Sequence, residues 1–210
     1  MDIEIIHIDE SFVVIEKPSG MLSVPGRGPD KQISAMSHFL EKFPDAIAQP
    51  SIHRLDMATS GLLVVARTKF AHKTISRQFQ DRVVKKSYFA LIDGHLQDES
   101  GYIELAFRVD IENRPHQMYD PIHGKLGITD WKRLGYEGQY TRVEFNPLTG
   151  RTHQLRVHSA HELGLGHPIV GDFLYGTGTD TNQLKLHAAY LGFNHPHSGE
   201  WIEFRSNPPF

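Results

Sequence analysis

Hydrophobic and polar residues along this chain follow patterns that predict a mixture of short strands and helices. The run Leu62–Ala66 is short, continuous and rich in Val and Leu, which is typical of a strand buried on both faces. Other strands are predicted where apolar residues alternate with polar ones or are bounded by turn residues, at 3–7, 12–16, 87–94, 101–107, 129–136, 140–145, 186–193 and 200–204. We expect 101–107 to be the antiparallel neighbour of 87–94, and 129–136 to form a hairpin with 140–145.

Apolar residues at helical spacing predict three helices. The segment 110–127 has no sustained period, so we expect an irregular connection there. The chain contains no internal repeat and no evident linker. We therefore predict one α+β domain over residues 1–210, with a mixed, mainly antiparallel sheet and flanking helices. The helices are expected to follow caps at Asp30 (ending at Phe43, before Pro44), Thr68 (reaching Phe79) and Thr152 (running towards Leu163).

Composition sets limits on the chemistry and the location of the protein. The chain has 210 residues, 39% of them hydrophobic, which is enough for a substantial buried core. It has no cysteine, so disulfides, thiolate nucleophiles and thiolate metal ligands are excluded. No apolar run approaches the ~18 residues needed to span a bilayer, and the N-terminus does not resemble a signal peptide. We expect a cytoplasmic monomer with no membrane partner.

Charge is distributed unevenly along the sequence. The net charge is −3, yet seven basic residues and one acid between Arg67 and Lys86 carry +6, which leaves −9 on the rest of the chain. A basic face on an acidic body is suited to binding a polyanion at one place. The alternative is an ordinary solvated helix face.

Candidate chemistry centres on the stretch Ser51–Gly61, which places Asp56 in polar, turn-prone sequence just before the buried strand. The simpler interpretation is a solvated loop in which Arg54 and Asp56 pair locally. A carboxylate in a partly dry site needs a nearby cation to stay ionised. Arg151 and Arg156 are the best candidates, and Arg151 follows a turn where its planar guanidinium is well placed to grip a carboxylate.

Several motifs occur together in a fixed order. The sequence HRLDMATSGLL at 53–63 resembles the catalytic motif of the RluA-type pseudouridine synthases, whose core reads HRLDxxTSG. Four further blocks resemble that family in the same order: KPSGML at 17–22, KKSYFA at 85–90, GRTHQLRVH at 150–158 together with GHPIVGD at 166–172, and LHAAYLGFNHP at 186–196. The resemblance covers nearly the whole chain, and five ordered blocks are far more specific than one HRLD.

The resemblance implies an enzyme that isomerises uridine to pseudouridine in RNA. It makes Asp56 the essential aspartate, acting either as nucleophile at C1′ or as a base at the 2′ position. By the same correspondence Tyr88 stacks beneath the target base, and Arg151 pairs with the catalytic carboxylate. Arg54 matches the arginine that enters the RNA and fills the space of the flipped-out nucleotide.

The expected partner is structured RNA, namely 23S ribosomal RNA, the tRNA anticodon loop, or both. Larger members carry an N-terminal S4-like domain that we expect to be absent here. The segment 159–165 is longer than the expected spacing, which leaves an RNA contact from that turn in doubt. The residues expected to contact RNA are Arg54, His53, Lys73, Arg77, Lys85 and Lys86.

The residues also allow three other functions. The fourteen histidines suggest a metal site, but no HExxH-like pair is present, so we expect no metal and no cofactor. A glycoside hydrolase needs two placed carboxylates, and no second acid is set like Asp56. A non-catalytic RNA-binding protein would use the same basic face. Asp56 argues against it, because a surface that only binds RNA gains nothing from a carboxylate that repels phosphate, whereas an isomerase requires one.

Overall fold

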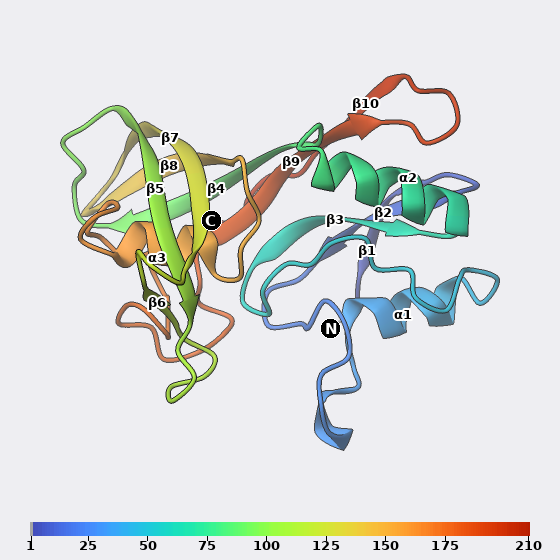
Figure 1. Ribbon diagram of the computed structural model, residues 1–210, viewed down its shortest axis with the longest axis horizontal. Coiled ribbons are helices and arrows are strands. Elements are labelled where there is room, and N and C mark those ends of the chain that lie inside the picture. Colours follow the sequence, from blue (N-terminus) through green and yellow to red (C-terminus); the bar gives the residue numbers. More distant parts are fainter. Residues whose placement is uncertain (1) are drawn as a thin grey trace. The chain divides into compact units, whose positions relative to one another are not determined.

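The computed structural model describes residues 2–210, which form ten strands and three α-helices (Figure 1). The chain divides into two compact units, the first made of residues 2–86 and 187–210 and the second of residues 87–186. The α+β class with a mainly antiparallel mixed sheet is confirmed. The single domain over 1–210 stays a prediction. No helix among the described residues is long and apolar enough to cross a membrane.

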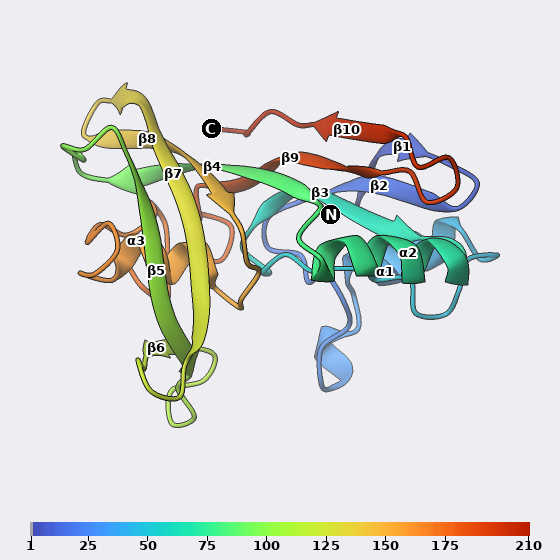
Figure 2. The same cartoon turned by 45° about the horizontal axis from the view of Figure 1, so that its top comes forward.

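Five strands belong to the first unit, in the order β1-β2-β3-β9, with β10 paired to β9 (Figure 2). Neighbouring strands are antiparallel except β3 and β9, which run parallel at Ser60–His187 and Gly61–Ala188. A parallel pair brings residues distant in sequence to the same end of two strands. The strands are β1 (Glu4–Ile8), β2 (Phe12–Lys17), β3 (Ser60–Ala66), β9 (Leu186–Asn194) and β10 (Trp201–Arg205).

Helix α2 (Lys69–Gln80) packs on these strands. Thr68 caps it, accepting a hydrogen bond from the Ala71 N–H, as the sequence predicts. All seven residues of β3 are buried, which confirms the interpretation of the Leu62–Ala66 run. The core between the helix and the strands contains Phe12, Val14, Leu62, Val64, Ala71, Ile75, Val84, Leu191 and Phe193.

The expected cap of the first helix is wrong. Asp30 lies in a short 3-10 helix, η1 (Pro29–Lys31), and α1 (Ala35–Lys42) begins later. Ser34 caps α1 in a reciprocal capping box, in which its side chain and that of Ser37 each accept from the other's backbone N–H. This box satisfies two of the free N–H groups at the start of the helix, which Asp30 is too far upstream to reach.

The second unit contains the strand order β4-β8-β7-β5-β6, with every neighbouring pair antiparallel. The hairpin of β7 and β8 is confirmed. The short helix α3 (Gln154–Ala160) lies against β7 in Figure 1 and is buried along most of its length. The strands are β4 (Lys85–Asp93), β5 (Ser100–Val109), β6 (Gln117–Tyr119), β7 (Lys125–Glu137) and β8 (Tyr140–Pro147).

The expected pairing of 87–94 with 101–107 is wrong, because β5 lies between β7 and β6. The connection after β4 is fixed against other strands: the Leu96 N–H donates to Thr141 Oγ1 at 3.1 Å, and Arg133 donates to the Leu96 carbonyl at 2.8 Å. The chain therefore crosses the β7–β8 hairpin instead of turning back along β4.

Two smaller expectations also need correction. The segment 110–127 is not wholly irregular, since it contains β6 and the first residues of β7. Helix α3 is not capped by Thr152: the residue before it is His153, in a left-handed conformation with no side-chain cap. The helix ends at Ala160, before the predicted Leu163.

Gly61 is needed where β3 meets β9. Its φ is +112°, a conformation that L side chains rarely adopt. A Cβ added at this residue would lie 2.4 Å from the Ala188 carbonyl oxygen and 2.6 Å from the Ala188 nitrogen. Because both obstacles are backbone atoms of a paired strand, the neighbour cannot move aside cheaply.

We expect Gly61→Ala to lower the free energy of unfolding by about 3–5 kcal/mol, because it combines backbone strain with a clash that cannot relax. Gly138→Ala is the control: its φ is +60° and no atom lies within 4 Å of an added Cβ, so about 1 kcal/mol is expected. Urea denaturation of both variants measures the difference. Equal losses would show that the contact with Ala188 does not constrain the fold.

Candidate active site

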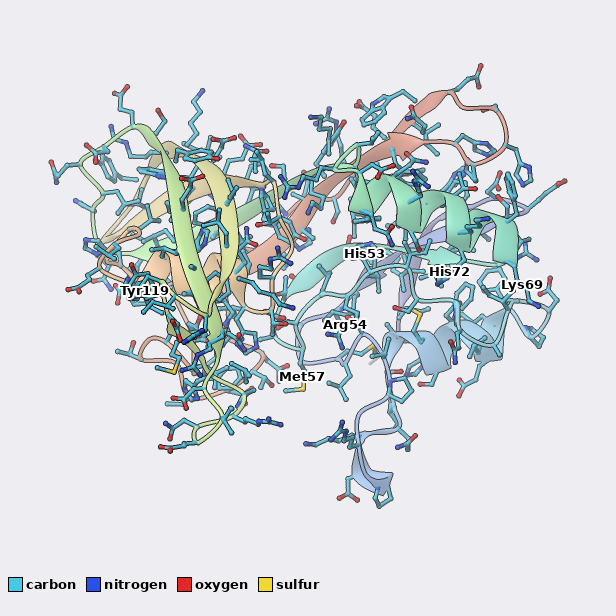
Figure 3. The ribbon with its side chains drawn as sticks, viewed as in Figure 1. His53, Arg54, Met57, Lys69, His72 and Tyr119 are labelled. Carbon is cyan, nitrogen blue, oxygen red and sulfur yellow. The ribbon has the colours of Figure 1, made fainter. Side chains whose placement is uncertain are left out.

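Asp56 lies in a short turn that leads directly into β3. Its backbone carbonyl accepts a hydrogen bond from the Thr59 N–H at 3.1 Å, and its side chain is half-buried. We call residues 53–60 the Asp56 loop; Figure 3 shows His53, Arg54 and Met57 along it. The loop thus presents a carboxylate at the start of a rigid, fully buried strand.

A second segment, residues 17–23, holds the backbone of the Asp56 loop, and we call it the clamp segment. Ser23 contacts the residue before Asp56 twice: its Oγ donates to the Leu55 carbonyl at 2.6 Å and accepts from the Leu55 N–H at 3.0 Å. Beyond Asp56, Ser19 Oγ donates to the Ala58 carbonyl at 2.7 Å. The loop is therefore fixed on both sides of its carboxylate.

Lys17 is the central residue of the clamp segment and is fully buried. Its Nζ donates to the carbonyl oxygens of Pro18, Met21 and Met57, at 2.8, 2.9 and 3.1 Å. The Gly20 N–H donates to the same Met57 carbonyl at 2.9 Å. Three donated hydrogen bonds use every proton of a lysine ammonium, so the clamp matches the charged form of the side chain.

Lys17 also supplies a positive charge next to the candidate carboxylate. Burial lowers the pKa of Lys17 to about 7, and the nearby charge of Asp56 acts in the opposite direction. The first unit therefore contains its own cation for Asp56.

His53 has a structural contact at one ring nitrogen. Its Nε2 accepts a hydrogen bond from the Val64 N–H at 3.1 Å, and the ring stacks on Phe79 with centroids 4.6 Å apart. Burial, together with the charge of Lys86, lowers the pKa of His53 to about 3. The ring is neutral at pH 7, so a phosphate contact through its charge is disfavoured. The role of His53 in RNA binding stays a prediction.

Lys85 and Lys86 begin β4, where successive side chains face opposite sides. Lys85 is exposed, whereas Lys86 is half-buried. Burial lowers the pKa of Lys86 to about 8. Lys86 and Tyr88 are two residues apart, so they lie on the same face of the strand and Lys85 does not. Of the two lysines, Lys86 is the better placed beside Tyr88.

The exposed side of α2 carries a stripe of cations, which we call the basic face. Lys69, Lys73 and Arg77 are spaced by four residues and are all exposed, while Ala71 and Ile75 on the other side are buried. Figure 3 labels Lys69 near the start of the helix. Arg77 pairs with an acid of the same helix end at 3.0 Å, but both groups are more than half exposed, so the pair is weak.

Tyr88 and Arg151 belong to the second unit, and their meeting with Asp56 stays a prediction. Tyr88 is half-buried in β4, opposite Phe145 of β8. The Arg151 side chain is exposed, with its Nε donating to the Leu126 carbonyl at 3.2 Å. Its backbone N–H donates to Gln154 Oε1 at 3.0 Å, which fixes the turn that carries it.

Arg156 is engaged within the second unit. Its guanidinium forms a buried, two-pronged ion pair with Asp172, with Nε–Oδ2 and Nη2–Oδ1 distances of 2.8 and 2.6 Å. Breaking such a pair leaves an uncompensated buried charge, which is strongly destabilising. Of the two arginines expected from the sequence, Arg151 is the one whose guanidinium remains at the surface.

Within residues 2–210 no group of three or more His, Asp or Glu side chains is arranged to hold a metal ion. The histidine at 158, one of those that suggested a metal, is fully buried, and neither of its ring nitrogens has a hydrogen-bond partner. Burial lowers the pKa of His158 to about 4. Its ring packs edge-on against Phe107 as an ordinary core aromatic.

The clamp role of Lys17, Ser19 and Ser23 was not predicted from the sequence, although KPSGML was part of the family resemblance. One signal was available: Lys17 ends the strand Phe12–Lys17, whose first four residues are apolar and buried. A lysine at the end of such a strand must either reach solvent or find several acceptors.

We expect Lys17→Met to lower the free energy of unfolding by about 3–5 kcal/mol, because it leaves buried carbonyl groups without a donor and removes a charge partner of Asp56. Lys31→Met, at an exposed position of the same unit, is the control and should change stability by less than about 0.5 kcal/mol. Urea unfolding curves give both values. A Lys17→Met protein as stable as the control would remove Lys17 from the clamp.

Comparisons with known proteins agree with these motifs and this fold. The family model described as RNA pseudouridylate synthase matches residues 11–161. The chain is 45% identical to the dual-specificity RNA pseudouridine synthase RluA of Pasteurella multocida, over 99% of this chain and 94% of that protein. It is 41% identical to the protein of the same name from Escherichia coli strain K12, over 98% and 93%.

A solved structure gives the same result. Human RNA pseudouridylate synthase domain containing 1 aligns with a TM-score of 0.77 and 33% identity, covering 100% of this chain and 84% of that one. The match of the family model over most of the chain, the full-length relatives and the shared fold all point the same way. The chain belongs to the RNA pseudouridylate synthase family, whose members are isomerases that convert uridine to pseudouridine.

Proposed function

We propose that this enzyme uses Asp56 as its reacting carboxylate and acts on uridines in 23S ribosomal RNA, in the tRNA anticodon loop, or in both. The fixed position of Asp56 between backbone groups held by the clamp segment carries the proposal. Supporting it, the relatives of nearly equal length are named dual-specificity synthases. The proposed location is the cytoplasm, because both kinds of RNA are found in that compartment. The proposed working form is a monomer.

The reaction breaks the bond between C1′ and N1 of the uridine and forms a bond between C1′ and C5. C5 loses a proton and N1 gains one, so the product is an isomer and no co-reactant is needed. Asp56 acts on the ribose, by attack at C1′ or by proton removal at the 2′ position. Both routes use the carboxylate of Asp56, whose charge acts on the neighbouring Lys17 side chain.

The other site residues take the roles that the motif resemblance gives them. The exposed Arg54 side chain fills the space left by the flipped nucleotide, an exchange that costs least in a loop. Tyr88 stacks beneath the base, with Lys86 on the same face of β4 to hold a phosphate. Arg151 pairs with Asp56. The engagement of Arg156 with Asp172 supports this choice between the two arginines.

The basic face on α2 and the exposed Lys85 hold the RNA backbone. Contacts of this kind give affinity rather than sequence choice, because phosphates are alike in every sequence. The exposure of Lys69, Lys73 and Arg77 on one side of a single helix suits the basic face to follow one stretch of RNA backbone.

Asp56→Asn should abolish turnover, by roughly 10³-fold or more, while RNA affinity stays within about twofold of wild type. The amide keeps the size of the side chain but can act neither as nucleophile nor as base. Asp30→Asn, at an exposed position of the same unit, is the matched control and should keep full activity. Pseudouridine formation on a stem-loop with one target uridine measures this, and clear activity of Asp56→Asn would refute the assignment.

Replacing Lys73 and Arg77 together with Ala should weaken RNA binding and flatten its salt dependence, because each lost phosphate contact removes about 0.7–0.9 from the slope of log affinity against log salt. Lys31 and Lys42 replaced together change the net charge equally and should leave the slope unchanged. Binding titrations between low and moderate salt give the slopes. The same slope in both double variants would make the basic face an ordinary solvated surface.

A further inference from the structure

Four polar side chains of the first unit form a continuous chain of hydrogen bonds, which we call the relay. Ser60 Oγ contacts His187 Nδ1 at 2.9 Å, and His187 Nε2 contacts Ser206 Oγ at 2.9 Å. Ser206 Oγ in turn makes a short contact with the Glu16 carboxylate. The relay thus joins the start of β3 through β9 to the segment after β10 and then to β2.

The chemistry of the end group fixes the direction of every bond. An ionised carboxylate only accepts, so the Ser206 hydroxyl donates its proton to Glu16. The Ser206 oxygen must then accept from His187 Nε2–H. A neutral imidazole with its proton on Nε2 leaves Nδ1 as an acceptor, so the Ser60 hydroxyl donates to it.

The surroundings of His187 favour the neutral ring that this direction requires. The residue is fully buried, and burial lowers its pKa to about 4. A hydrogen bond with the backbone of Ser206 acts in the opposite direction. A ring that lost neutrality would donate from both nitrogens, and the Ser60 hydroxyl would lose its acceptor.

The relay ends at the exit of the Asp56 loop. Ser60 is both the last residue of that loop and the first of β3, and it stands in register with His187 of β9. The clamp segment holds the loop before Asp56 and just after it, through Leu55, Met57 and Ala58. The relay holds the loop at a further point, Ser60, where a shift of the strand would move the turn.

We propose that His187 is a positioning residue for Asp56, acting through Ser60, with Ser206 and Glu16 orienting its ring. The inference rests on the proposed function, in which Asp56 is the reacting carboxylate. A displacement of about 1 Å at a reacting group can cost as much as 10²-fold in rate. The relay therefore acts on the chemical step and not on the affinity for RNA.

Single-turnover assays on the stem-loop separate the two effects. Ser60→Ala and Ser206→Ala should each lower the single-turnover rate about 5- to 10-fold, with RNA dissociation constants within about twofold of wild type. The double variant should be no slower than the slower single one, because both changes break the same relay. Ser198→Ala, in an exposed turn of the same unit, is the control and should keep the wild-type rate.

Two conservative changes test the direction of the bonds. His187→Asn places its carbonyl oxygen near the position of Nδ1 and can still accept from Ser60, so it should retain a rate within about threefold of wild type. His187→Gln places its amide near the position of Nε2 and leaves Ser60 without an acceptor, so it should be about 5- to 10-fold slower. A melting curve for each variant shows that it is folded.

The results distinguish the relay from the function on which it rests. Wild-type single-turnover rates in folded Ser60→Ala and His187→Gln overturn the relay while leaving Asp56 in place. The relay is also overturned if these variants bind RNA more weakly while their single-turnover rate stays unchanged. Activity of Asp56→Asn, by contrast, overturns the proposed function itself.

Discussion

The buried ammonium of Lys17 is the contact on which the candidate active site depends. A charge inside a protein is tolerated only when it is paired and its hydrogen bonds are satisfied. Here the carbonyl groups of Pro18, Met21 and Met57 all accept hydrogen bonds from the Lys17 Nζ. Met57 is the residue after Asp56. The hydrogen bonds that satisfy the buried Lys17 therefore also fix the backbone beside Asp56.

The same principle recurs in the second unit. Gln154 Oε1 accepts from Thr149 Oγ1 and from the Arg151 N–H, and its Nε2 donates to the Ile128 carbonyl. Gln154 is buried, whereas the Arg151 guanidinium lies at the surface. In both units, buried polar groups fix the backbone beside a side chain for which we propose a catalytic role. Such preorganisation matters because a catalytic group that must first be ordered loses part of its advantage.

The sequence pattern correctly predicted those elements that depend only on nearby residues. The buried strand β3 and the Thr68 cap of α2 both follow from spacing and side-chain chemistry within a few residues. The pairing of β5 did not, because it depends on how the 94–99 connection is held against strands that come later in the chain. The relay was equally out of reach, since His187 meets Ser60 only through a parallel pairing between distant strands. The Asp56 loop was found because its polar residues precede a buried strand; the clamp segment was not, because its contacts are with backbone.

The arrangement of charge in the first unit explains how a carboxylate can serve beside a polyanion. Burial keeps the His53 and His187 rings neutral, so neither adds charge to the interior around the loop. The Lys17 side chain lies near Asp56 and its positive charge offsets that of the carboxylate, while the exposed basic face is the surface that we propose attracts phosphate. A surface that only bound RNA would gain affinity by losing Asp56. The unit instead places a buried lysine and backbone hydrogen bonds around this carboxylate, which supports the proposal that Asp56 itself reacts.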